Sequence, residues 1–130
     1  MSQEQSQERF EKGLEKRRRV LGAEYVDQSI RNADDFTRPL QQLVTEYCWG
    51  EVWQRQGLSD RDRSVINLAM ITALNRPHEL RLHVRGAINN GLSVEEIREI
   101  LLQTAVYCGV PAAIDAFRNA REVLSEMGEL

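Results

Sequence analysis

The chain has 130 residues, 28% of them charged, and a formal net charge of −3 at pH 7. This slightly acidic balance lacks the basic surface of a nucleic-acid-binding protein, so we expect no nucleic-acid partner. The apolar stretches fall well short of the roughly 18 residues of a membrane span, and the polar start lacks the apolar core of a signal peptide, so we expect a cytoplasmic protein without membrane contacts.

Helical periodicity fills the spaces between the 3 prolines and 8 glycines, and it predicts an all-α fold. We divide the chain into an N-terminal helical arm, residues 1–24, and a main part, residues 25–130, which together form one structural domain. The arm is strongly charged and carries a helix over about residues 6–21. A second, short helix is expected over about residues 25–33.

The next predicted helix begins after Asp34 and Asp35, which are suitable capping residues. We expect Gly50 to break or bend this helix and Gly57 to end it, with a continuation of the helix through Glu51-Val52-Trp53 left open. Its apolar residues recur at the spacing of one helix face, which predicts that they face the core. These residues are Phe36, Leu40, Leu43, Val44 and Tyr47.

The second half of the chain begins with Ser59 and Asp62, whose spacing is close to that of a capping box and indicates a helix start. Apolar residues surround nearly the whole circumference of this helix between Val65 and Leu74. We therefore expect the helix to be central and covered by others.

Two helices are expected at the end of the chain. Ser93 and Glu96 form a full capping box for the first of them. The stretch Gly109-Val110-Pro111 starts the second helix, where the missing N–H of proline is tolerated. The apolar stripe of that last helix consists of Ala113, Phe117, Ala120 and Leu124.

The helix between Pro77 and Gly91 carries the strongest chemical signal, and these two residues are suited to open and close it. Glu79 and His83 lie one turn apart, about 40° around the helix axis, and flank its apolar stripe. The spacing predicts a carboxylate–imidazole pair at the edge of a pocket, with Asn90 pointing nearly the same way. An ordinary surface pair is equally compatible with this spacing.

A metal site is disfavoured by the spacing of the two histidines. His78 and His83 are five residues apart, about 140° around a helix, whereas a zincin helix needs histidines at i and i+4. The remaining metal alternative joins Glu79 and His83 to a carboxylate from elsewhere, such as Glu46 or Glu51. We expect no metal ligand among these residues.

Thiol chemistry is disfavoured as well, because Cys48 and Cys108 form no C-x-x-C motif and have no histidine near them in sequence. We expect two reduced thiols in core or interface positions.

Five tracts of the chain carry a resemblance to a known family. They are Trp49-Gly50-Glu51-Val52-Trp53, Arg61-Asp62-Arg63-Ser64, Asn75-Arg76-Pro77-His78-Glu79-Leu80-Arg81-Leu82-His83, Gly86-Ala87-Ile88-Asn89-Asn90-Gly91 and Tyr107-Cys108-Gly109-Val110-Pro111-Ala112-Ala113. Together they resemble the 4-carboxymuconolactone decarboxylases. The match covers most of the chain, from about Tyr25 to Leu124.

The wider superfamily includes the alkylhydroperoxidase D-like proteins, whose active helix carries C-x-x-C and a histidine four residues after the second cysteine. His83 matches that histidine, while Arg76 and Glu79 stand where the cysteines would be. A thiol-dependent peroxidase is therefore the less favoured interpretation within this fold.

The resemblance implies an all-α bundle of about six helices that assembles into a homo-oligomer, a hexamer built as a trimer of dimers, with active sites near subunit interfaces. It also implies decarboxylation of 4-carboxymuconolactone to 3-oxoadipate enol-lactone in protocatechuate catabolism, the β-ketoadipate pathway. The partner is then a small lactone dicarboxylate, and no cofactor is used.

The chemistry of this reaction suits several residues of the matching tracts. We assign His83 as donor to the lactone oxygen or as proton carrier, with Glu79 orienting the imidazole and favouring its protonated form. Glu51 is a second candidate acid or positioning group. The candidate substrate-binding residues are Arg76, Arg81, Arg85, Trp53 and Asn90, although the three arginines differ in angular position and Trp53 is also suited to packing. The alternative from another class is a non-catalytic helical oligomer that binds a small carboxylate.

Overall fold

The structure is a computed structural model that describes residues 2–130. The predicted all-α fold is confirmed: these residues form seven α-helices and one π-helical segment, and no strand. Contacts divide the chain into two compact units, Met1–Leu58 and Ser59–Leu130, which we describe separately. The division into an arm and a main part after residue 24 stays a prediction.

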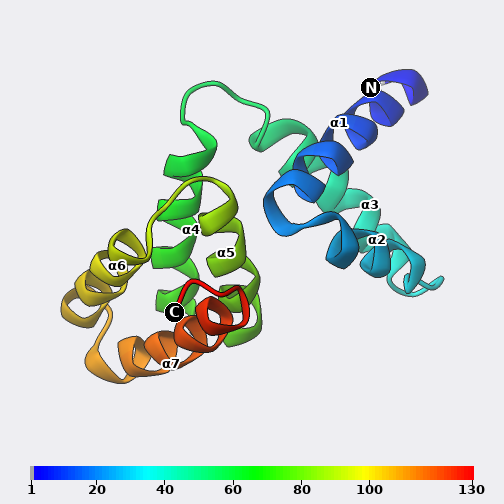
Figure 1. The fold of residues 1–130 in the computed structure, drawn as a ribbon. Helices are drawn as coiled ribbons and strands as arrows, with labels where there is room; N and C mark the ends of the chain where they lie inside the picture. Colours follow the sequence, from blue (N-terminus) through cyan, green and yellow to red (C-terminus); the bar gives the residue numbers. More distant parts are fainter. Residues whose placement is uncertain (1) are drawn as a thin grey trace. The chain divides into compact units, whose positions relative to one another are not determined.

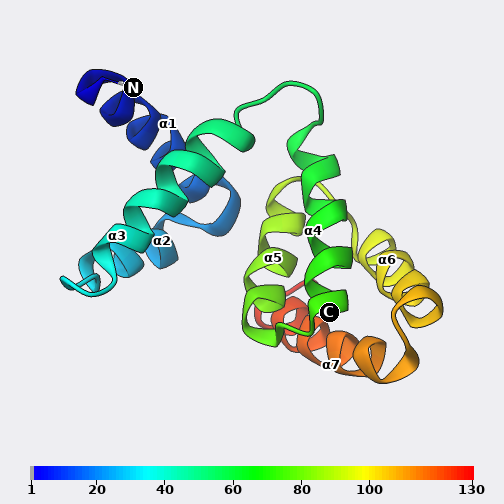
Figure 2. The ribbon, with the colours of Figure 1, turned by 180° about the vertical axis from the view of Figure 1, so that it is seen from behind.

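The first unit contains four helical elements, two of which are continuous with each other. They are α1 (Gln3–Leu21), α2 (Ala23–Arg31), α3 (Arg38–Leu43) and the π-helix η1 (Val44–Val52). Pro39 lies in the first turn of α3, where its missing N–H leaves no bond unmade. Figure 2 shows α3 running straight on into η1, which packs along α1.

Gly50 does not break its helix, because η1 continues through it as far as Val52, and the helix ends there rather than at Gly57. Gly50 instead allows two helix backbones to meet. A Cβ at Gly50 would overlap the carbonyl oxygen of Arg9 on α1, and a Cβ at Gly13 would overlap that of Thr45 on η1. The two glycines therefore set how closely α1 and η1 pack.

Four of the five apolar residues predicted to face the core in the helix after Asp35 are exposed, and only Val44 is half-buried. Phe36 is 92% exposed, and Leu40, Leu43 and Tyr47 are all more than half exposed. The core of the first unit is formed by other residues: Val20, Leu21, Val26, Trp49 and Trp53. Periodicity identified a genuine apolar stripe, but it could not tell which surface covers that stripe.

The second unit is a four-helix bundle (Figure 1) made of α4 (Asp60–Leu74), α5 (Pro77–Asn89), α6 (Val94–Tyr107) and α7 (Val110–Glu126). α4 lies between α5 and α6, and α7 packs against both α5 and α6. Its core is formed mainly by Leu68, Leu80, Val84, Ala87, Ile97, Leu101, Ala120, Val123 and Leu124.

The predicted helix ends of the second unit are confirmed. The Ser59 hydroxyl accepts a hydrogen bond from the Asp62 N–H at 3.0 Å. Ser93 and Glu96 form both bonds of the capping box, and Gly91 follows α5 with φ of 95°. These signals depend only on neighbouring residues, so the sequence specifies them directly.

The expectation that other helices cover α4 all round is wrong for the isolated chain. Leu68 is fully buried, but Ile66, Met70 and Leu74 are 40%, 49% and 66% exposed. Both cysteines are exposed as well, so neither occupies the core position considered for it. Among residues 2–130, no helix combines the length and the hydropathy that a membrane crossing needs.

Candidate active site

His83 lies on α5 beside the residues that anchor this helix in the core. Leu80 is 2% exposed, Val84 and Ala87 are fully buried, and the His83 side chain is partly buried next to them. Burial lowers the pKa of His83 from 6.5 to about 4, because the protonated imidazole loses solvation. The imidazole of the folded protein is therefore neutral near pH 7.

Two amide side chains join α5 to α4. The Asn67 Nδ2 of α4 lies 3.5 Å from the Nδ1 of His83. At the C-terminal end of α5, Asn90 Nδ2 donates to the Ser64 hydroxyl at 2.9 Å and to the Asp60 carbonyl at 3.3 Å. The predicted substrate-binding residue Asn90 thus uses its donor group to hold α5 against α4.

Glu79 is on the same helix, one turn before His83, and its side chain is exposed to solvent. The prediction that its negative charge favours a protonated imidazole is wrong, since the pKa of His83 is lowered, and desolvation is the cause. His83 Nδ1 lies 3.5 Å from an amide nitrogen, Nδ2 of Asn67.

Two of the three candidate arginines are engaged with α7. Arg81 pairs with Glu122 at 2.6 Å and with Glu126 at 3.2 Å, and Arg85 lies 3.5 Å from Glu126. Arg81 also donates to the Asn119 side-chain oxygen at 3.4 Å. A substrate carboxylate would have to compete with these glutamates for either guanidinium.

Arg76 differs from the other two arginines. It is the residue just before Pro77, at the start of α5, and its side chain is exposed. Within residues 2–130, no hydrogen bond or ion pair involves its guanidinium. Of the three predicted carboxylate-binding arginines, it is the one whose charge is not already paired.

The remaining candidates, Glu51 and Trp53, belong to the first unit. Glu51 pairs with Arg9 of α1, and its side chain is 48% exposed. Trp53 is 7% exposed and stacks on Trp49 with ring centroids 4.6 Å apart, so it packs within this unit. A second carboxylate of the same π-helix, Glu46, accepts a hydrogen bond from Ser6.

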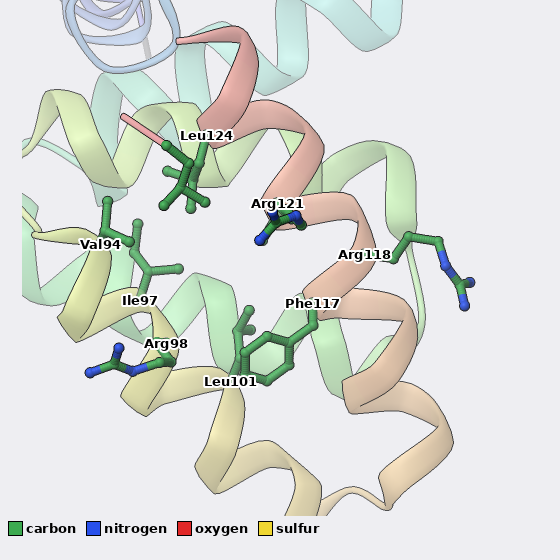
Figure 3. A pocket seen from close by; sticks show the side chains of 10 residues that line it. Val94, Ile97, Arg98, Leu101, Phe117, Arg118, Arg121 and Leu124 are labelled. Carbon is green, nitrogen blue, oxygen red and sulfur yellow. The ribbon is translucent and has the colours of Figure 1, made fainter. Parts of the chain in front are cut away.

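A mainly apolar cavity of about 380 Å³ lies between α6 and α7 (Figure 3). Val94, Ile97 and Leu101 line it from α6, and Phe117 and Leu124 from α7. In Figure 3 the Arg121 side chain lies over this cavity, whereas Arg118 points away from it. The side chains that line it include no histidine, aspartate or glutamate, so none of them is a candidate catalytic acid or base.

The side chains in the part of the chain that the structure describes do not form a candidate metal site. No three histidine, cysteine, aspartate or glutamate side chains lie close enough together to hold an ion.

Asn67 is the residue of this site that the sequence analysis did not identify. It stands in the stretch Val65-Ile66-Asn67-Leu68, where it interrupts an otherwise apolar run. A polar side chain at such a position usually needs a hydrogen-bonding partner inside the fold. That interruption was the available signal, although its partner on α5 emerges only from the packing of the two helices.

Comparison with known proteins identifies relatives of this chain. The model of the carboxymuconolactone decarboxylase family matches residues 38–122. The chain is 48% identical over 118 residues to nitrosuccinic acid decarboxylase of Metarhizium robertsii, a match that covers 91% of this chain and 82% of that protein. It is 39% identical over 122 residues to 4-carboxymuconolactone decarboxylase of Acinetobacter baylyi, which covers 94% of this chain and 91% of that protein.

Proposed function

Because the chain belongs to the carboxymuconolactone decarboxylase family, we propose that it decarboxylates 4-carboxymuconolactone to 3-oxoadipate enol-lactone without a cofactor. As a member of this family the protein is a carboxy-lyase. The structural observation that supports the proposal is the partly buried, neutral imidazole of His83 on α5. The proposed setting is protocatechuate catabolism, the β-ketoadipate pathway.

The proposed substrate supplies the electron sink for its own decarboxylation. The bond between the ring and the departing carboxylate breaks, carbon dioxide leaves, and the electron pair moves through the double bond to the lactone carbonyl. A proton then adds to carbon. The protein has to bind the remaining carboxylate, stabilise the enolate oxygen as its charge develops, and provide the proton.

His83 is suited to the second of these tasks in its neutral form. A neutral imidazole carries one N–H, which donates a hydrogen bond to the enolate oxygen without first needing a proton from solution. Such a donor is most effective in a site of low polarity, where it is held in place before the reaction starts. The partial burial of His83 provides that setting.

The other tasks fall to residues whose roles stay proposals. Arg76 is the candidate for holding the retained carboxylate, since its guanidinium is not paired within residues 2–130. Arg81 and Arg85 would do so only by exchanging the glutamates of α7 for substrate. Glu79 and Glu51 are the candidate acids that protonate carbon.

Decarboxylation of nitrosuccinic acid is a second candidate function, favoured by the 48% identity to the decarboxylase of that acid. In nitrosuccinic acid, loss of the carboxylate next to the nitro group sends the electron pair onto the nitro oxygens, and carbon is then protonated. The two candidate substrates share a retained carboxylate and an oxygen atom that becomes negatively charged. The same arginine and the same imidazole therefore suit both.

We also propose that the chain works as a homo-oligomer, a hexamer arranged as a trimer of dimers. Its support is the apolar surface that each unit leaves exposed, including Phe36 of the first unit and Leu74, Val106 and Tyr107 of the second. Light scattering on the purified protein measures the mass of the assembly directly, and a monomer at micromolar concentration would contradict the proposal.

Turnover tests the function. The purified protein is incubated separately with freshly prepared 4-carboxymuconolactone and with nitrosuccinate, and carbon dioxide release is followed with and without a chelator. We expect release from one of the two acids, unaffected by chelation. If both acids bind and neither is consumed, the decarboxylase proposal fails and the non-catalytic carboxylate-binding alternative replaces it.

A further inference from the structure

We propose that Asn67 is a positioning residue: its amide N–H donates to Nδ1 of His83 and so keeps the imidazole proton on Nε2, which makes Nε2 the donor of the neutral ring. The contact itself is the 3.5 Å approach of Asn67 Nδ2 to His83 Nδ1. The catalytic consequence rests on the proposed function, whereas the position of the proton does not.

The argument begins with the chemistry of the two groups. The NH₂ group of an amide donates hydrogen bonds and does not accept them. It therefore pairs with an imidazole nitrogen only where that nitrogen presents a lone pair. A neutral imidazole has one protonated and one unprotonated nitrogen. If Asn67 donates to Nδ1, the proton of the neutral ring must lie on Nε2.

Burial makes this choice of nitrogen matter. An exposed histidine protonates readily, and both of its nitrogens then become donors. His83 stays neutral throughout the ordinary working range because burial lowers its pKa to about 4. The ring therefore has a single N–H, and a neighbouring group decides which nitrogen carries it.

The position of Asn67 on α4 is well fixed. Its neighbour Leu68 is fully buried, and Ser64, one turn earlier, is fully buried and accepts a hydrogen bond from Asn90 of α5. The contacts of Ser64 and Asn67 thus join the same two helices about one turn apart. A side chain held between two packed helices can orient its partner more sharply than one on a loop can.

The consequence for catalysis follows from charge. An Nε2–H presents a donor to the oxygen that becomes negative in the transition state, while the other tautomer would present a lone pair to it. Loss of the Asn67 amide should therefore lower kcat far more than it changes KM, by roughly 10²-fold for an oxyanion donor.

The test reads the tautomer without any substrate. The chain has 2 histidines, so ¹⁵N-labelled imidazoles give two spin systems, and exposed His78 provides an internal reference. We expect long-range ¹H–¹⁵N correlations of the wild-type protein at pH 7 to show His83 with its proton on Nε2. A proton on Nδ1 in the wild-type protein would overturn the proposal, whatever the variants do.

Variants make the test directional. Asn67→Asp replaces the donor with an acceptor, so the proton should move to Nδ1 and kcat should fall. Gln103→Glu adds the same charge at an exposed position of α6 and should change neither the tautomer nor kcat. Unchanged His83 signals in a folded Asn67→Asp protein would contradict the proposal. If the tautomer behaves as expected but no carbon dioxide is released, the proposed function fails and the positioning role stands.

Discussion

Gly13 of α1 and Gly50 of η1 lie opposite each other where the two helices cross, with no room for a side chain on either. A Cβ at Gly13 would lie 2.7 Å from the Gly50 nitrogen and closer still to the Thr45 carbonyl oxygen. The obstructing atoms are backbone, so they cannot move aside by rotating a side chain.

Gly13→Ala should therefore separate α1 from η1 and destabilise the protein by at least about 3 kcal/mol, the size typical of severe overpacking. Thermal or denaturant unfolding followed by circular dichroism measures the loss. Gly57→Ala is the matched control, since a Cβ there meets nothing within 4 Å. Equal stability of the two variants would contradict a role of this close helix crossing in stability.

Protonation of His83 should contribute to acid denaturation. The pKa of His83 is about 4 in the folded protein against 6.5 as its ordinary value, so between these pH values the unfolded chain binds a proton that the folded chain does not. Stability should thus be full above about pH 6.5 and fall as the pH drops toward 4, by up to about 3 kcal/mol. Urea unfolding of the wild-type protein and of His83→Gln across this range isolates the contribution. If the difference in unfolding free energy between the two proteins stayed the same across this pH range, His83 would not contribute to acid denaturation.

The pH profile of turnover distinguishes a neutral donor from a charged one. Because the pKa of His83 is about 4, the imidazole is already neutral at pH 5, so titration of His83 should not lower kcat/KM as the pH rises from about 5 to 7. His83→Gln should reduce turnover by about 10²-fold to 10³-fold at every pH in this range. A wild-type profile that falls through pH 6, with a fall that His83→Gln abolishes, would instead indicate that the imidazolium is the active form.

The arginines should separate into a binding group and a structural group. Arg76→Gln should raise KM by about 10-fold, the effect of removing one charge-assisted hydrogen bond, and leave the thermal midpoint unchanged. Arg81→Gln should lower stability by about 1 kcal/mol, because it breaks partly exposed ion pairs with Glu122 and Glu126, and should change KM less. Steady-state kinetics and thermal unfolding of both variants check this division, which a reversed pattern would refute.

The two glutamates of η1 provide a matched test of the proposed acid. Glu51→Gln should lower kcat by about 10²-fold if this carboxylate transfers a proton. Glu46→Gln removes a carboxylate from the same π-helix, where it accepts a hydrogen bond from Ser6, and should leave kcat unchanged. A third variant, Arg9→Gln, removes the partner of Glu51 while keeping the carboxylate. If it lowers kcat as much as Glu51→Gln does, the role of Glu51 is to hold α1 rather than to move a proton.

Local signals in the sequence predicted the fold well, whereas features that depend on distant contacts were not predictable. The caps at Ser59 and Ser93 need only neighbouring residues, and both are confirmed. A break was predicted at Gly50, but this position needs glycine because a carbonyl group of another helix lies against it. An apolar stripe such as the one containing Phe36 looks the same in sequence whether its own chain or another surface covers it.

In the candidate site, too, the features that depend on distant contacts were not predictable from the sequence. The helix that carries Glu79 and His83 was predicted from its caps and its spacing, but the charge state of His83 depends on burial, which the sequence does not display. Asn67 lies 16 residues away along the chain and reaches His83 only because α4 and α5 pack side by side. The roles given to Arg76, Glu79 and Glu51 stay predictions.

The last turns of α7 place negative charge where a helix tolerates it least. Glu122 and Glu126 lie near the negative end of the helix dipole, and the last turn of α7 contains no basic residue of its own. Arg81 and Arg85 of α5 supply the missing positive charge from outside the helix. Salt that screens these pairs leaves the carboxylates facing the dipole alone, so the C-terminal end of α7 is where fraying of the bundle should begin at high ionic strength.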